Sequence, residues 1–130
     1  MSTGVIDAGI AIGWIRGRHR ALNRLENLFS SCREGKLRLV ISAVNLAEVL
    51  MHTAEYSRAT GVDPVSLLHA WGIRIHPPDE AIARRVAKLQ TSLVDGFAAA
   101  TALDLGARLH TTDAELVRQL KGTKLAVSRY

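Results

Sequence analysis

The sequence predicts an α/β fold: a three-layer α/β/α sandwich with helices on both faces of a mainly parallel, roughly five-stranded sheet. Short apolar runs of strand-like composition alternate along the chain with segments whose apolar residues recur at helical spacing. Strands that alternate with helices favour a parallel sheet covered on both faces. The 130 residues contain no internal repeat, low-complexity tract or linker, so we expect one domain over residues 1–130.

Each element is predicted from its apolar period and from the residues at its ends. Ser42 and Asp63-Pro64 are typical helix starts, Gly35 is a typical helix end, and Thr112 with Glu115 matches a capping box. The predicted elements, in chain order, are a strand at 5–7, helices at 10–15 and 21–32, a strand at 37–41, helices at 42–54 and 63–72, a strand at 73–75, helices at 77–90 and 97–105 (the latter opened by Asp95-Gly96), a strand at 107–110, a helix at 112–122 and a strand at 125–127.

Composition limits the class of protein. Lys and Arg outnumber Asp and Glu by 17 to 12, which gives a net charge of +5 and a pI near 10.0. Such a domain is either a handler of polyanions such as nucleic acid or a protein with ordinary surface charge. Cys32 is the only cysteine, so an intrachain disulfide is excluded. No secretory signal or membrane-spanning segment is recognisable, and we expect a soluble cytoplasmic protein.

Four acidic residues recur in apolar surroundings at strand ends or in the first turns of helices: Asp7, Glu48, Asp95 and Asp113. Three of them have an alternative explanation as helix caps or partners of caps, Glu48 through Asn45. Asp7 follows Val5-Ile6 directly and has no such explanation. Because ligands gather at the carboxyl ends of parallel strands, we expect the four acids to converge there.

Converging carboxylates repel one another unless a cation neutralises them. Oxygen ligands from Asp and Glu suit a hard divalent ion, Mg²⁺ or Mn²⁺, and ions of this type assist hydrolysis of phosphodiesters. The pattern therefore predicts a metal-dependent enzyme that acts on a phosphate ester.

The chain resembles PIN-domain ribonucleases, and in particular the VapC toxins of toxin–antitoxin pairs. The matching segments have the family's order along nearly the whole chain, and the last two are the most specific. They are Val5-Ile6-Asp7, Ile41-Ser42 through Leu46-Ala47-Glu48-Val49-Leu50, Asp95 with Ala98-Ala99-Ala100-Thr101-Ala102-Leu103, and Leu109-His110-Thr111-Thr112-Asp113.

This resemblance implies roles for individual residues. Asp7 and Asp95 would be direct ligands of one or two ions, and Glu48 and Asp113 would act directly or through water. Thr111 corresponds to the hydroxyl residue that orients a ligand or the attacking water. The implied activity is cleavage of RNA, often transfer RNA, to 5′-phosphate and 3′-hydroxyl ends. The implied partners are a VapB-like antitoxin and a second copy of the chain.

Two departures from the family pattern keep a second function open. The residue after Asp7 is Ala8, followed by Gly9, where the family usually has a Ser or Thr. The connection of residues 90–94 before Asp95 is also short. A PIN domain weakened in this way would bind RNA or an antitoxin without cutting efficiently. A phosphatase that is phosphorylated on Asp7 would require an acid at position 9, and a receiver domain would require an acidic pair before its phosphorylated residue; neither is present.

A basic stretch follows the first predicted strand and contains Arg16, Arg18, Arg20 and Arg24. Beside an acidic metal site such residues can hold an RNA backbone, and otherwise they form a solvated surface. Both interpretations remain open from the sequence.

Overall fold

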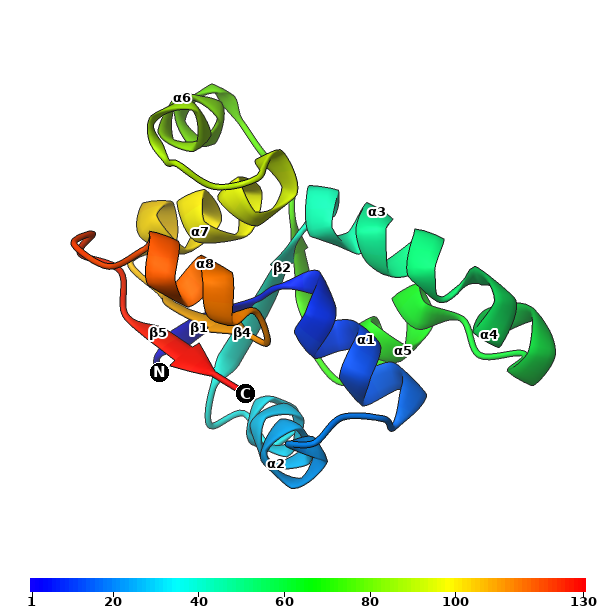
Figure 1. Cartoon of the computed structure of the whole chain (residues 1–130). Coiled ribbons are helices and arrows are strands. Elements are labelled where there is room, and N and C mark those ends of the chain that lie inside the picture. Colours follow the sequence, from blue (N-terminus) through cyan, green and yellow to red (C-terminus); the bar gives the residue numbers. More distant parts are fainter.

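Five parallel strands form one sheet in the order β3-β2-β1-β4-β5 in the computed structural model, which describes residues 1–130 (Figure 1). Every neighbouring pair is parallel. The prediction of a five-stranded, mainly parallel sheet is confirmed. The strands are β1 (Thr3–Ile6), β2 (Arg38–Ser42), β3 (Arg74–His76), β4 (Arg108–Thr111) and β5 (Val127–Arg129).

Helices cover both faces of this sheet. Helices α1, α2, α3 and α5 contribute to one apolar cluster, and α7 and α8 contribute to the other, with α6 packed on α7 (Figure 1). This arrangement confirms the predicted three-layer α/β/α sandwich. The helices are α1 (Ala8–Arg16), α2 (Leu22–Arg33), α3 (Ala43–His52), α4 (Ala54–Thr60), α5 (Pro64–Ala70), α6 (Glu80–Lys88), α7 (Leu93–Leu105) and α8 (Ala114–Gln119).

The central strand β1 is apolar because both of its faces are buried. Val5 packs into the α7–α8 cluster, while Ile6 packs into the opposite cluster. The same alternation occurs on β2, where Val40 and Ile41 belong to different clusters. Neighbouring side chains of a strand point to opposite faces, so a strand with two covered faces is a continuous apolar run.

Helix α7 is central, as its composition predicts. Ala98, Ala99, Ala100 and Ala102 are fully buried, and the helix contacts α3, α6 and three strands. Small side chains allow the backbone of α7 to approach the sheet closely. The start of α7 is thereby fixed near the carboxyl edge of the sheet.

Several predicted boundaries are wrong, because a neighbouring residue provides the better cap. Helix α7 begins at Leu93, where the Ser92 hydroxyl accepts a hydrogen bond from the Asp95 backbone N–H at 3.3 Å. Asp95 is therefore a first-turn residue and not the cap. The predicted helix at 42–54 ends at His52, because the buried Thr53 leaves helical geometry and α4 starts anew. The fifth strand lies at 127–129, two residues later than predicted.

The connection between α6 and α7 is short, as the sequence indicates: α6 ends at Lys88 and α7 begins at Leu93. No helix of the chain combines the length and the apolar character that crossing a membrane requires.

Candidate metal centre at the carboxyl edge of the sheet

The strand order reverses its direction at the end of β1. After β1 the chain turns to α1 on one face of the sheet, and after β4 it turns to α8 on the other face. Strands β1 and β4 are neighbours, with Ile6 paired to His110. Connections that leave adjacent strands toward opposite faces open a ligand site between them. Asp7 lies directly at this point.

Asp7 is held in place by both of its carboxylate oxygens. The side chain is only 5% exposed. Oδ1 accepts a hydrogen bond from the Ile10 backbone N–H at 3.0 Å and so caps α1, while Oδ2 accepts one from the Thr111 hydroxyl. A carboxylate offers about four lone-pair positions. Each oxygen can therefore still accept from, or coordinate, one further partner.

Burial makes the charge of Asp7 costly. Desolvation raises the pKa of this carboxyl from 3.8 to about 6, although the hydrogen bonds from Thr111 and Ile10 oppose the rise. The negative charge of Asp95 raises the pKa of Asp7 further, which shows that the two acids lie near each other. A divalent cation beside Asp7 would offset both the desolvation and the repulsion.

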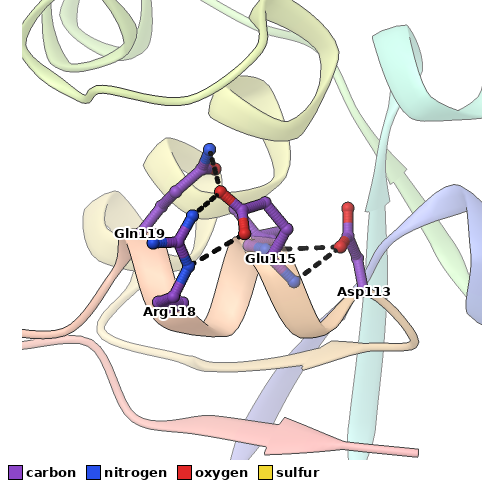
Figure 2. A network of polar contacts seen from close by, with 5 residues as sticks. Asp113, Glu115, Arg118 and Gln119 are labelled. Atoms are coloured by element: carbon purple, nitrogen blue, oxygen red, sulfur yellow. Dashed lines mark hydrogen bonds and ion pairs between the residues drawn. The ribbon is translucent and has the colours of Figure 1, made fainter.

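Asp113 is joined to Asp7 through Thr111. The fully buried Thr111 hydroxyl donates to Asp7 and accepts a hydrogen bond from the Asp113 backbone N–H at 3.0 Å. Asp113 caps α8: its Oδ1 accepts from the backbone N–H groups of Glu115 at 2.9 Å and Leu116 at 3.3 Å (Figure 2). The other oxygen of Asp113 makes no hydrogen bond within the protein and remains available.

The predicted capping box around Thr112 and Glu115 is wrong. Asp113 is the cap, because β4 continues through Thr111 and the helix can begin only after it. Glu115 does not reach back to the chain before α8. Its carboxylate instead accepts hydrogen bonds from Arg118 and Gln119 on the exposed surface of the helix (Figure 2).

Glu48 is half-buried on α3. Helix α3 is linked to α7 by Asn45, a residue that we did not predict as part of the site from the sequence. The Asn45 side chain is 1% exposed, and its Nδ2 donates to the Val94 carbonyl at 3.1 Å, next to Asp95. It does not cap the helix or partner Glu48, because Ser42 is the cap. In the sequence, Asn45 is notable only as a polar residue between two apolar ones, about one helical turn before Glu48.

The four predicted acids are not all equally close. The charge of Asp95 acts on Asp7, and Asp113 is linked to Asp7 through Thr111, whereas no hydrogen bond joins Glu48 to any of them. No three acidic, histidine or cysteine side chains approach closely enough to hold one ion together. Mg²⁺ commonly uses one or two carboxylates and several waters. The pair Asp7 and Asp95, together with the buried and unpartnered Oδ1 of Asn45, suits such an ion.

The predicted basic residues separate into two groups. Arg24 lies 4.3 Å above the Tyr130 ring and donates to the Arg129 carbonyl at 3.0 Å. The Tyr130 backbone N–H donates to the Thr111 carbonyl at 2.9 Å, so Arg24 belongs to the carboxyl edge. The exposed Arg16 is the last residue of α1, about 14 Å along the helix axis from Asp7, and the exposed Arg18 and Arg20 follow it.

Comparison with known proteins finds the same fold in several solved structures. A chain of a toxin–antitoxin complex from Klebsiella pneumoniae superposes with a TM-score of 0.71 and 18% identity, covering 98% of both chains. A chain of VapBC2 from Rickettsia felis, bound to a promoter DNA fragment, gives 0.70 and 16%, again with 98% of both covered. VapC20 of Mycobacterium tuberculosis, described as a toxin that cleaves the sarcin–ricin loop, gives 0.65 and 12%, covering 88% of this chain and 93% of that one.

Among curated proteins, none matches this chain in sequence. The PIN domain, in contrast, matches residues 4–121, which include Asp7, Glu48, Asp95 and Asp113. The chain therefore belongs to the PIN domain family.

Proposed function

We propose that this chain is a metal-dependent endoribonuclease of the VapC type, which hydrolyses RNA phosphodiesters to inhibit translation and growth. The observation that carries the proposal is the buried Asp7 at the junction of β1 and β4, close to Asp95 and linked through Thr111 to Asp113. Asp7 also caps α1, but an Asn could cap this helix without the cost of a buried charge near the half-buried Asp95. A bound cation would account for the two carboxylates, because its charge would stabilise both of them.

In this proposal Asp7 and Asp95 bind Mg²⁺ or Mn²⁺, and Glu48 and Asp113 contribute directly or through water. The ion, when bound, supplies an activated water and stabilises charge on the phosphate, so the products carry 5′-phosphate and 3′-hydroxyl ends. Thr111 fixes the orientation of the Asp7 carboxylate through its hydrogen bond. Ser92 and Asn45 fix the start of α7, from which Asp95 projects.

The proposed substrate is RNA, with transfer RNA as the first candidate. Arg24 offers a cation at the same edge of the sheet as Thr111, and Arg16, Arg18 and Arg20 extend the positive surface along α1. Phosphate contacts of this kind position a strand without reading its sequence. The net charge of +5 favours a polyanionic substrate in the same way.

The proposed partners are a VapB-like antitoxin and a second copy of the chain, in the cytoplasm. Several proteins with the same fold were solved as toxin–antitoxin complexes. On this chain Leu50 and Met51 of α3 and Leu93 at the start of α7 are exposed apolar residues. Exposed apolar side chains of this size favour a protein contact.

The test compares purified wild-type protein with Glu48→Gln and Asp95→Asn in the cleavage of transfer RNA with Mn²⁺. Glu80→Gln is the matched control, since Glu80 is an exposed residue of α6 paired with Arg84. We expect cleavage by the wild type and the control and at least a tenfold loss in both site variants. Growth arrest on induced expression should follow the same order.

RNA that stays intact with wild-type protein at every metal concentration, while still binding to it, would refute the nuclease and support the RNA-binding module. Two features favour this alternative: Ala8 stands where the family usually has a hydroxyl residue, and the connection before Asp95 is short.

A further inference from the structure

Glycine at position 9 is explained by the space around it. Gly9 is the second residue of α1 and has ordinary helical backbone geometry. A Cβ atom at this position would collide with the Thr112 hydroxyl, and it would lie 3.4 Å from the Thr112 Cβ and 3.6 Å from Asp7 Oδ1. Any larger residue at position 9 therefore competes with Thr112 for a place beside the Asp7 carboxylate.

The Thr112 hydroxyl occupies that place without a partner. It makes no hydrogen bond within the protein, although Thr112 is only partly exposed and the hydroxyl of the preceding Thr111 is bonded to Asp7. A partly buried hydroxyl usually finds a protein or water partner. The Asp7 carboxylate borders the same space, since its Oδ1 would be 3.6 Å from a Cβ atom at position 9.

Ala8, the residue that departs from the family pattern, does not take part. Its side chain is 1% exposed and packs into the apolar cluster beneath α1. A hydroxyl at position 8 would be inserted among apolar neighbours. The hydroxyl next to Asp7 comes instead from the β4–α8 junction, and the absence of a side chain at Gly9 gives it room.

We propose that Thr112 is a positioning residue of the metal centre: its hydroxyl, which lies in the space that Gly9 leaves free, holds a water molecule beside the Asp7 carboxylate. This inference rests on the proposed function, because the water matters only where an ion is bound. Thr112 acts through this water and touches neither the ion nor the scissile phosphate. Groups that act on a metal ligand in this way typically change metal affinity about 10- to 100-fold.

The test moves the hydroxyl from one element to the other. Thr112→Ala removes it. Gly9→Ser combined with Thr112→Ala returns a hydroxyl to the same space from α1, and Gly9→Ala combined with Thr112→Ala returns the Cβ alone. The two double variants differ by a single oxygen atom. Thr60→Val, an exposed threonine on α4, is the control for loss of a hydroxyl elsewhere.

Mn²⁺ affinity is measured by titration calorimetry, together with kcat and KM for RNA. We expect Thr112→Ala to weaken Mn²⁺ binding about tenfold and to lower kcat more than it raises KM. Gly9→Ser/Thr112→Ala should recover most of the affinity, and Gly9→Ala/Thr112→Ala should not. Thermal unfolding with EDTA checks that each variant is folded. If Thr112→Ala is unfolded, Thr112→Ser, which keeps the hydroxyl, is compared with Thr112→Val, which lacks it.

Wild-type affinity in Thr112→Ala would overturn the inference and leave the proposed function intact. Equal recovery by both double variants would also overturn it, because packing alone would then explain Gly9. If the wild-type protein binds no Mn²⁺ and cleaves no RNA, the proposed function fails and the role of Thr112 fails with it.

Discussion

Replacing Asp7 by Asn should stabilise the metal-free protein at neutral pH. Asn keeps one oxygen that can cap α1 at the Ile10 N–H, and its amide NH2 takes the place of Oδ2 and can donate to the Thr111 hydroxyl, so the buried charge is removed while the contact with Thr111 reverses its direction. Burial raises the pKa of Asp7 from 3.8 to about 6. Each pKa unit corresponds to about 1.4 kcal/mol, so the charged carboxylate lowers the free energy of unfolding by up to about 3 kcal/mol at pH 7.

The sign of the pH dependence follows from proton binding. Between pH 3.8 and 6 the folded protein holds a proton on Asp7 that the unfolded chain has already lost. Stability from this group is therefore complete below pH 3.8 and is lost as the pH rises to 6. Asp7→Asn has no such loss. The two proteins should be similar near pH 4, and the variant should unfold roughly 10 °C higher at pH 7.

The assay is urea unfolding with EDTA at several values of pH from 4 to 7, read as the difference between variant and wild type. Asp63→Asn is the matched control, because Asp63 also caps a helix through Ser66 but is exposed, and its hydrogen bonds with Ser66 lower its pKa. That variant should gain nothing at pH 7. A stability difference for Asp7→Asn that is absent at pH 7, or that does not grow with pH, would refute the reasoning.

Two further predictions concern buried polar groups. Burial lowers the pKa of His110, which faces the Tyr130 hydroxyl, from 6.5 to about 4. The free energy of unfolding should therefore fall by up to about 3 kcal/mol as the pH falls from 6.5 to 4. The variant His110→Asn should show a weaker dependence on pH, measured with Asp7→Asn present in both proteins. Asn45→Ala should lower the free energy of unfolding by about 1–3 kcal/mol and also weaken Mn²⁺ binding, because it removes the hydrogen bond to Val94. Urea unfolding and calorimetry measure the two effects, with Asn27→Ala as a control at an exposed site. Unchanged Mn²⁺ binding would show that the link to α7 does not support the metal site.

The sequence predicts what is decided locally. The order of strands and helices follows from apolar periods, and the buried position of Asp7 follows from the apolar residues on either side. Cap positions are harder to predict, because adjacent residues compete. Thr112 and Asp113 can both begin a helix, and the length of β4 decides between them. Ser92 likewise excludes Asp95 as a cap, since its hydroxyl accepts the hydrogen bond from the Asp95 backbone N–H.

Contacts between distant segments could not be predicted from one sequence. The hydrogen bond from Thr111 to Asp7 spans 104 residues, and that from Asn45 to Val94 spans 49. Apolar periods identify which face of an element is buried and leave its register against another element undetermined. For the same reason the place of Glu48 beside the other three acids stays a prediction.

The stability that Asp7 costs is connected to the function that we propose. A carboxylate that is costly to charge in the empty protein becomes favourable when a cation binds, so ion binding should stabilise the fold. The same burial keeps water away from the carboxylate, which strengthens its interaction with a charge placed beside it. An exposed acid at this position would not destabilise the metal-free protein, but it would bind the ion less tightly. Asp7→Asn should therefore be more stable than the wild type only without metal, and saturating Mn²⁺ should reduce or reverse the difference between the two proteins.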